Sequence, residues 1–308
     1  MTNMKAVRVH DYGGVEVLRL EDAPRPQPGI GEVLVRVHAS SVNPIDWKTR
    51  AGYLKAYMPL PRPFVLGRDV SGVVEATGRG VTAFKLGDEV YGLVSGAYAQ
   101  YVVAKQSDLA RKPRSLDHAH AAAIPLAALT AWQALFDKAN LDRGQKVLIQ
   151  GGAGGVGSFA VQLAKWKGAH VIATASGKNQ GLLREIGVDQ SIDYERTKFE
   201  DVVSNVDAVF DTIGGDTQQR SLRVLKRGGV LVSVAAPPSS EEAAKFGVKA
   251  EFAITQPSAA QLAKIAELVD SGQLKPIIDT VLPLTEVRRA HEMSESGHVR
   301  GKILLTVD

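Results

Sequence analysis

The stretch KVLIQGGAGGVGSFAVQLAKWK, residues 146–167, carries the strongest structural signal in the chain. Its first five residues are mostly apolar, as in a buried strand, and its last twelve place apolar residues at helical spacing. Between them, Gly152 to Gly157 fit G-x-G-x-x-G, the fingerprint of a dinucleotide-binding turn. The glycines allow a tight turn, and the following helix offers free amides to a pyrophosphate. The alternative is a glycine-rich turn that only lets the helix pack closely on the sheet.

Downstream of this unit, strands alternate with helices, and the strands are apolar nearly throughout. This pattern predicts a parallel, doubly wound sheet of the α/β class. Near the C-terminus we expect two further helices and a last strand. The predicted strands are 170–174, 191–194, 207–213, 229–235 and 302–307, and the predicted helices are 156–167, 182–187, 217–225, 258–271 and 286–296.

The first third of the chain consists of short β-rich runs separated by glycine and proline, which predicts a compact β-barrel-like domain. Residues 43–67 differ, because they hold four prolines and show no clean period. We expect a long irregular loop there, and such loops inside compact domains are usually functional or disordered. The predicted strands are 4–10, 15–21, 32–39, 70–77, 89–93 and 97–104.

The chain has 308 residues, and at roughly 150 residues per domain this length predicts two domains. Hydrophobic residues make up 44% and charged residues 23%, which excludes collagen-like, disordered and coiled-coil chains. Cysteine is absent, so the chain can form no disulfide, thiol nucleophile, thiolate-bound cluster or zinc site that needs sulfur.

The 37 basic and 33 acidic residues give a net charge of +4, and they alternate along the chain instead of forming blocks. A clustered basic face is therefore not indicated. The N-terminus lacks the apolar run of a secretory signal, and the longest apolar stretch, residues 121–136, is shorter than the about 20 residues of a bilayer span. We expect no nucleic-acid partner, no membrane span and a cytoplasmic protein.

The end of the second predicted strand indicates which dinucleotide binds. A site for NAD usually has an acidic residue there, on the ribose 2′-hydroxyl, but none occurs between Gly157 and Glu185. Hydroxyls, an amide and a cation follow the strand instead, and these suit the 2′-phosphate of NADPH. The alternative for the cation is a solvated surface lysine. The residues concerned are Thr174, Ser176, Lys178 and Asn179.

Four motifs in order resemble the medium-chain dehydrogenase/reductase superfamily. Within it the chain looks like the zinc-free quinone oxidoreductase group, which includes zeta-crystallin and plant enone and alkenal reductases. The resemblance implies a GroES-like, β-rich catalytic domain, residues 1–120 and 260–308, and an inserted Rossmann domain, residues 121–259, that binds NADP(H). The motifs are LGRDVSGVVEATGRGVTAFKLGDEVYG (66–92), IPLAALTAWQAL (124–135), VLIQGGAGGVGSFAVQLAKWKGAHVIATAS (147–176) and GHVRGKILL (297–305).

The zinc enzymes of this superfamily carry a cysteine ligand in the loop that matches Asn43, and a histidine that matches Arg68. A fixed cation opposes binding of a divalent metal. Of the seven histidines, His118 and His120 are two apart, a spacing that does not share one helix face, so we interpret them as solvated or capping. We expect no metal site.

Without a metal, the nicotinamide supplies the hydride and the protein stabilises charge that develops on the acceptor oxygen. The predicted catalytic residues are Asn43, Lys48 and Tyr53, with Asp46 fixing the loop. In enone reductases that share the VNPxD(Y/W)K pattern, the lysine matching Lys48 contacts the cofactor. The alternatives are a turn-shaping role for Asn43, an exposed lysine at position 48 and an aromatic lid at Tyr53.

Other cofactor contacts come from strand ends and from the resemblance. Thr130 is a candidate phosphate donor or a helix-interior hydroxyl, and Tyr194 matches a tyrosine near the adenosine phosphate or is a rim aromatic. Gly301 and Lys302 match a segment that folds back towards the nicotinamide. The predicted NADP(H)-binding residues are Lys48, Thr130, Gly152, Gly154, Gly155, Val156, Gly157, Thr174, Ser176, Lys178, Asn179, Tyr194, Thr212, Gly214, Ala236, Gly301 and Lys302.

These observations predict an NADPH-dependent reductase of activated carbon–carbon double bonds in α,β-unsaturated ketones or aldehydes. A quinone reductase is the alternative, and a non-catalytic NADPH-binding sensor or crystallin-like protein is a third, because a fold does not fix a function. The resemblance also implies a homodimer that pairs through residues 229–236 and 249–255. The physiological substrate stays open, because it depends on the shape of loop 52–63.

Overall fold

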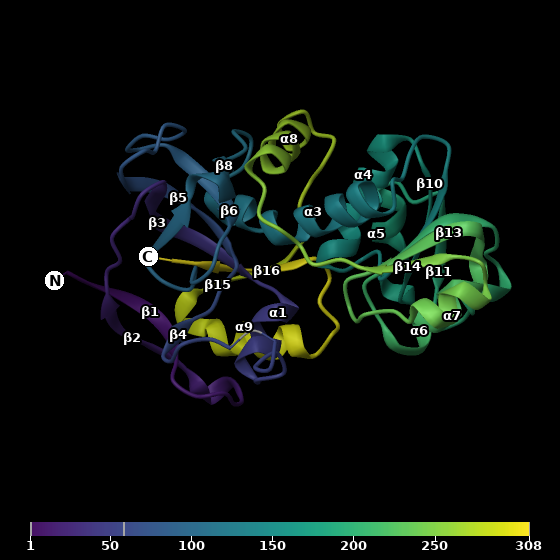
Figure 1. The fold of residues 1–308 in the computed structure, drawn as a ribbon, viewed down its shortest axis with the longest axis horizontal. Coiled ribbons are helices and arrows are strands. Elements are labelled where there is room, and N and C mark those ends of the chain that lie inside the picture. The colour runs from purple at the N-terminus through teal and green to yellow at the C-terminus, as the bar shows by residue number, and fades with distance from the viewer. Residues whose placement is uncertain (1, 58, 308) are drawn as a thin grey trace. The chain divides into compact units, whose positions relative to one another are not determined.

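The computed structural model describes residues 2–57 and 59–307. The chain divides into two compact units (Figure 1). Unit 1 comprises Met1–Leu126, Pro257–Gly272 and Pro276–Asp308, and unit 2 comprises Ala127–Gln256 and Gln273–Lys275. The division into catalytic and cofactor-binding domains at residues 120 and 260 stays a prediction.

Unit 1 contains two β-sheets. In β3, Val33, Val35 and Val37 are buried in one hydrophobic core, and Leu34, which points to the other face of the sheet, is buried as well. The C-terminal strand β16 pairs antiparallel with β3, with Leu304 opposite Ser41, so the end of the chain joins the N-terminal third. The small sheet has the order β2-β1-β4, and the large one β15-β16-β3-β5-β6-β8 with β7 on β3. The strands are β1 (Asn3–Val9), β2 (Leu18–Pro24), β3 (Glu32–Val42), β4 (Phe64–Val65), β5 (Asp69–Thr77), β6 (Glu89–Leu93), β7 (Tyr101–Lys105), β8 (Leu109–Arg111), β15 (Ile278–Pro283) and β16 (Lys302–Thr306).

The prediction of an irregular loop over residues 43–67 is wrong in part, because this segment contains the helix α1 (Pro44–Arg50). Asn43 occupies the N-cap, Pro44 the first helical position and Asp46 the third, and each residue type favours a helix start at that position. The predicted strand 15–21 also begins later, at Leu18, since Val15–Val17 form a 3-10 turn. The other helices of unit 1 are α2 (His118–Ala122), α8 (Ala259–Asp270) and α9 (Val287–Glu295).

Unit 2 is built on a six-stranded parallel sheet of order β11-β10-β9-β12-β13-β14. From β9, successive strands are added first on one side (β10, β11) and then on the other (β12 to β14). The boundary between β9 and β12 is therefore the switch point, where doubly wound folds bind ligands beyond the carboxyl ends of the strands. The α/β prediction for this part of the chain is confirmed. The elements are β9 (Lys146–Gln150), β10 (His170–Ala175), β11 (Gln190–Asp193), β12 (Val206–Asp211), β13 (Leu225–Ser233), β14 (Lys249–Phe252), α3 (Pro125–Trp132), α4 (Gly155–Lys167), α5 (Gln180–Glu185), α6 (Gly215–Ser221) and α7 (Ser240–Lys245).

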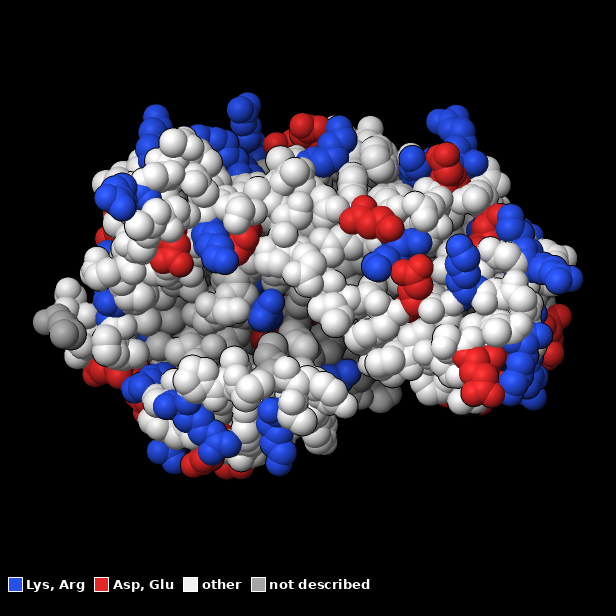
Figure 2. Space-filling view, in the orientation of Figure 1, with Lys and Arg blue, Asp and Glu red and all other residues white. Residues whose placement is uncertain are grey.

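Surface charge follows the sequence pattern. Basic and acidic side chains are interspersed over the face shown in Figure 2. Within residues 2–57 and 59–307, no helix is both long and apolar enough to cross a membrane.

Candidate functional site

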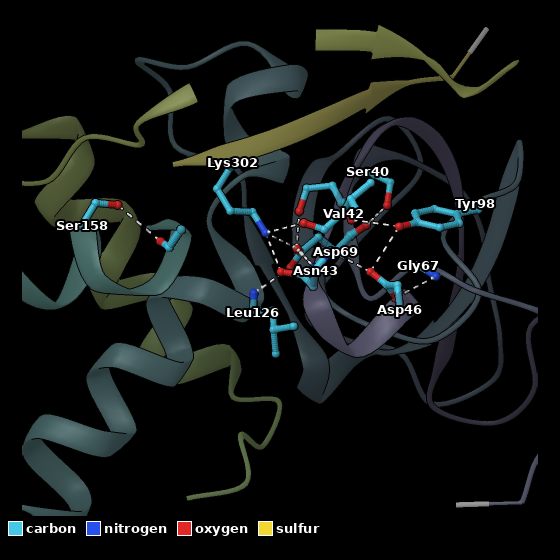
Figure 3. Close-up of polar contacts among 12 residues, drawn as sticks. Ser40, Val42, Asn43, Asp46, Gly67, Asp69, Tyr98, Leu126, Ser158 and Lys302 are labelled. Atoms are coloured by element: carbon cyan, nitrogen blue, oxygen red, sulfur yellow. Dashed lines mark hydrogen bonds and ion pairs between the residues drawn. The ribbon is translucent and has the colours of Figure 1, made fainter. Parts of the chain in front are cut away.

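The start of α1 is fixed by a buried carboxylate. Asp46 is 1% exposed, and its Oδ2 accepts the backbone N–H of Asn43 at 2.9 Å, one half of a capping box. The same oxygen accepts the hydroxyl of Tyr98 at 3.1 Å, and Oδ1 accepts the amide of Gly67 at 3.3 Å (Figure 3). Burial raises the pKa of Asp46 to about 6. Asp46 thus determines where Asn43 lies, which agrees with its predicted role.

The side chain of Asn43 belongs to a second buried network, which joins β3, β5 and β16 (Figure 3). Its Oδ1 accepts from the Lys302 ammonium, and its Nδ2 donates to Asp69 Oδ2 at 2.7 Å. Asp69 is fully buried and also accepts the hydroxyl of Ser41 at 2.5 Å and the amide of Leu126 at 2.6 Å. Burial lowers the pKa of Lys302, although the charges of Asp69 and Asp46 oppose that shift.

The other two predicted catalytic residues lie outside this network. Lys48 is half-buried on α1, with its Nζ 5.7 Å from the centroid of the Trp47 ring. Tyr53 is 68% exposed, and its ring meets Trp47 edge-on at 6.0 Å between centroids. The structure therefore joins Asn43 with Lys302 and joins neither with Lys48 or Tyr53. Catalytic roles for Lys48 and Tyr53 stay predictions.

The segment that matches the zinc ligands has other partners here. Arg68 donates to the hydroxyl of Ser95 at 3.3 Å, and Asp69 is occupied by the donors named above. Among the described residues, no three His, Asp or Glu side chains gather where they could hold a metal ion.

The interpretation of His118 as solvated or capping is wrong. His118 is partly buried, stacks on His38 at 4.6 Å between ring centroids and hydrogen-bonds Ser71 at 2.8 Å. Burial lowers the pKa of both histidines. His120, by contrast, does serve the start of α2, since its amide donates to the N-cap Asp117 at 2.8 Å.

The glycine loop of unit 2 has two kinds of glycine. A Cβ on Gly157 would lie 2.1 Å from the oxygen of Gly151, and one on Gly152 would lie 2.8 Å from the Cβ of Ala173, so both positions are closed by packing. A Cβ on Gly154 would meet nothing nearer than 3.4 Å. Gly154 is the N-cap of α4 and offers no side chain to the free amides of the first turn, which suits an anionic ligand. Gly155 and Val156, the first residues of α4, are half-buried.

The hydroxyls predicted to bind the 2′-phosphate are engaged within unit 2. The amide of Gly151 donates to Thr174 Oγ1 at 3.1 Å, and Thr174 donates to Gln150 Oε1 at 2.7 Å. Ser176 is buried, and its Oγ accepts from Asn179 Nδ2 at 3.2 Å. Thr174 therefore holds the glycine loop on the sheet edge. Lys178 is exposed beside the end of β10, and Arg196, beyond the end of β11, is paired with Asp193.

Two acidic residues from the end of β11, Asp193 and Glu195, lie beside Gly177 at this edge, although no acidic residue directly follows β10 itself. Glu195, which follows β11, accepts the amide of Gly177 through Oε2 at 3.2 Å. Because β11 pairs in parallel with β10, with Asp193 opposite Ala175, the two strands end side by side. The prediction considered the residues after the second strand of this unit, and the carboxylates come from the end of the third.

The remaining predicted cofactor residues of unit 2 lie at strand ends or in helices. Thr130 Oγ1 lies 2.6 Å from Thr255 Oγ1, and Tyr194 is 57% exposed. Thr212 donates to the backbone oxygen of Gln150 at 2.8 Å, which ties the end of β12 to the end of β9. Gly214 has a φ of 81°, and Ala236 follows the neighbouring strand β13.

The last two predicted residues belong to unit 1. Gly301 has a φ of 83°, and a Cβ there would lie 2.2 Å from the oxygen of Ile277, so only glycine fits. Lys302 is 4% exposed. Asn43 and Asp69 bind its ammonium, and no sequence motif predicts these contacts.

Comparisons with known proteins agree with this architecture. Two family models match the chain, the alcohol dehydrogenase GroES-like domain over residues 29–114 and the zinc-binding dehydrogenase domain over residues 186–305. The 2-methylene-furan-3-one reductase of Solanum lycopersicum is 36% identical over 99% of this chain and 79% of its own. The NADPH-dependent alkenal/one oxidoreductase, chloroplastic, of Arabidopsis thaliana is 37% identical over 98% of this chain and 79% of its own.

Among solved structures, the quinone oxidoreductase from Coxiella burnetii superimposes with a TM-score of 0.92 at 38% identity, and the two chains cover each other fully. The chain therefore belongs to the medium-chain dehydrogenase/reductase superfamily, as an oxidoreductase of its quinone and enone reductase group.

Proposed function

We propose that the protein uses NADPH to reduce the activated carbon–carbon double bond of α,β-unsaturated ketones or aldehydes, without a metal ion. The observation that carries this proposal is the Asn43 amide, a neutral donor held in a buried network by a lysine and an aspartate. The relatives named as a furanone reductase and as an alkenal/one oxidoreductase support the substrate class. The quinone oxidoreductase structure supports the alternative, a quinone reductase.

The residues of unit 2 fit a nicotinamide dinucleotide. The first turn of α4, which begins at Gly155, offers uncapped amides to the pyrophosphate, and the absence of a Cβ at Gly154 leaves its backbone open to approach. Lys178 supplies a cation beside the end of β10, where Rossmann folds bind the ribose 2′ position. When bound, the nicotinamide would supply the hydride.

The chain's own residues then have two tasks. Negative charge accumulates on the carbonyl oxygen of an enone as its β-carbon is reduced, and a preorganised donor that costs no reorganisation lowers the barrier. Asn43 is such a donor, because its partners fix it before substrate arrives. Water can protonate the resulting enolate, so the proposal requires no general acid.

A substrate panel tests the proposal directly. We expect enones and alkenals to oxidise NADPH and to be reduced to saturated carbonyl compounds. The loss of the NADPH absorbance band measures the rate, and product analysis identifies the saturated carbonyl. Faster turnover of quinones to hydroquinones would favour the alternative. Tight NADPH binding with no turnover of any acceptor would identify a non-catalytic binding protein.

The preference for NADPH over NADH is expected to depend on Lys178. In Lys178→Glu, we expect the affinity for NADPH to fall about fivefold to several-hundredfold, because a charge pair near 4 Å contributes roughly 1 to 4 kcal/mol, while NADH affinity changes little. Glu195→Gln should act in the opposite direction and increase the preference for NADPH. The Glu195 carboxylate accepts the amide of Gly177, next to Lys178, and its negative charge repels a 2′-phosphate there. Fluorescence titration of both nucleotides measures the effect.

Lys245→Glu is the matched control, since Lys245 lies on α7, which packs against β14 at the opposite edge of the sheet. It should leave both affinities unchanged. Equal losses of NADPH and NADH affinity in Lys178→Glu would contradict the assignment of this lysine to the 2′-phosphate.

We also propose that the protein is a homodimer that pairs through β14. This strand ends the sheet of unit 2, and Phe252 and Ile254 are 37% and 70% exposed beside it. An open strand edge with apolar side chains is a template for pairing with a second copy. Light scattering of wild type and Ile254→Lys tests this, with a monomeric variant as the expected result. Cytoplasmic residence stays a prediction.

A further inference from the structure

Lys302 at the start of β16 is enclosed by polar groups of unit 1. Its ammonium donates to Asn43 Oδ1 and to the backbone oxygen of Val42 at 3.2 Å, and it lies 3.5 Å from Asp69 Oδ2 (Figure 3). A buried ammonium requires partners of this kind, because desolvation is costly when a charge is not paired and hydrogen-bonded. In the proposed reduction this lysine is a partner of Asn43 and does not contact the substrate.

The chemistry of the two charged groups decides how the amide between them is oriented. An ammonium group can only donate hydrogen bonds, and a carboxylate can only accept them. The Asn43 oxygen must therefore face Lys302, and its NH₂ group must face Asp69, as observed. A reversed amide would place NH₂ against the ammonium and oxygen against the carboxylate, so both contacts would be repulsive. Lys302 and Asp69 together thus allow one orientation of Asn43.

In this orientation the Asn43 NH₂ group has one more N–H than its hydrogen bond to Asp69 uses. The Nδ2 atom of Asn43 carries two hydrogens, and within residues 2–57 and 59–307 its one partner is Asp69. We propose that Lys302 is a positioning residue, which acts with Asp69 to hold Asn43 with its second amide N–H directed to the oxygen of the acceptor. This inference rests on the proposed function and assigns Lys302 an effect on turnover without contact with substrate.

The test uses Asp69→Asn/Lys302→Met, which removes both charges together and so leaves no unpaired buried charge. The amide of Asn43 then loses both of the charged partners that fix its orientation. We expect kcat to fall about tenfold to a hundredfold. This is less than the about 10²- to 10³-fold loss typical when an oxyanion donor is removed altogether, because the Asn43 side chain is still present. The KM for the enone and the Kd for NADPH should stay within about threefold. Thermal unfolding confirms that the variant is folded.

A mutant cycle separates positioning from structural support. Adding Asn43→Ala to the double variant should lower kcat only to the level of Asn43→Ala alone, because the pair acts only through the Asn43 amide. Lys302→Arg, which keeps a cationic donor, is the second variant and should retain more activity than Lys302→Met. Lys112→Met is the matched control. The Lys112 side chain is likewise buried, at 6% exposed, and its ammonium donates to the backbone oxygen of Pro113, but it lies outside this network. It should keep the wild-type kcat.

A folded double variant with kcat within threefold of wild type would overturn the inference, as would losses that multiply when Asn43→Ala is added. If Lys302→Met and the double variant both fail to fold, Lys302→Arg provides the test. A folded Lys302→Arg protein that is no more active than Asn43→Ala also overturns the inference. A wild-type protein that turns over no acceptor refutes the proposed function instead, so the two failures are distinct.

Discussion

Replacing Gly157 by alanine is expected to abolish NADPH binding and to destabilise unit 2 by about 3 kcal/mol, the upper end of typical overpacking costs. The added Cβ would lie 2.1 Å from the oxygen of Gly151 and 2.8 Å from its carbonyl carbon. Both atoms are backbone, so no side chain can move aside. Either α4 moves away from the sheet or the loop that carries the first-turn amides shifts. Thermal unfolding and fluorescence titration with NADPH measure the two effects.

Two alanine variants serve as controls for Gly157→Ala. In Gly154→Ala the new Cβ meets nothing nearer than 3.4 Å, so the fold should remain stable while NADPH binds more weakly, because backbone approach to the pyrophosphate is restricted. Gly181→Ala lies in α5 with open space around it and should raise stability by about 0.5 to 1 kcal/mol. Wild-type NADPH affinity in Gly157→Ala would contradict the loop geometry.

The fold of unit 2 could be predicted because its signals are local. The apolar strand β9, the glycines and the helix α4 follow one another within residues 146–167, and each element satisfies its own period. The stop of β10 at Ala175 was also close to the predicted residue 174. Elements of this kind need no distant partner to be recognised.

Helix α1 shows that a local signal can be outweighed. Asn43, Pro44 and Asp46 form a helix start in the sequence itself, yet four prolines between residues 43 and 67 favoured an irregular loop. The later prolines lie beyond the end of α1 at Arg50, so they do not interrupt it. Cap residues should therefore be weighed before the proline content of the segment as a whole.

The partners of Lys302 could not have been predicted from the pattern. Its hydrogen bond to Asn43 joins positions 259 residues apart, and it depends on the antiparallel pairing of β16 with β3. The contact of Glu195 with Gly177 likewise depends on the register of β11 against β10. Strand neighbours and register come from tertiary packing, and they decide which charged groups meet.

His291 of α9 is a fully buried histidine beside a buried cation. Arg50 donates to its Nδ1 at 3.3 Å and also binds Glu295 at 2.5 Å, while the His291 ring meets Tyr98 edge-on at 5.8 Å between centroids. Among the described residues, Nε2 has no hydrogen-bond partner. Burial, together with the charge of Arg50, lowers the pKa of His291 to about 3.

This histidine is expected to make the protein sensitive to acid. The unfolded chain protonates His291 near pH 6.5 and the folded chain only near 3, so stability falls as pH drops through this window, by up to about 5 kcal/mol at 1.36 kcal/mol per pKa unit. Asp46 opposes the effect, because its folded pKa of about 6 exceeds its unfolded value of 3.8. Its contribution to stability is lost as pH rises through 6 and regained on acidification, about 3 kcal/mol in all.

Two variants separate these opposing contributions. His291→Asn keeps an acceptor for Arg50 but cannot titrate, so its free energy of unfolding should fall less than that of wild type between pH 7 and pH 4. Asp46→Asn should fall more steeply, because the offsetting gain is removed. Urea unfolding at each pH unit measures the slopes. Since α9 packs against α1, which begins beside Asn43, the loss of kcat on acidification should follow the same order. Parallel pH profiles for wild type and His291→Asn would show that the buried histidine does not limit acid stability.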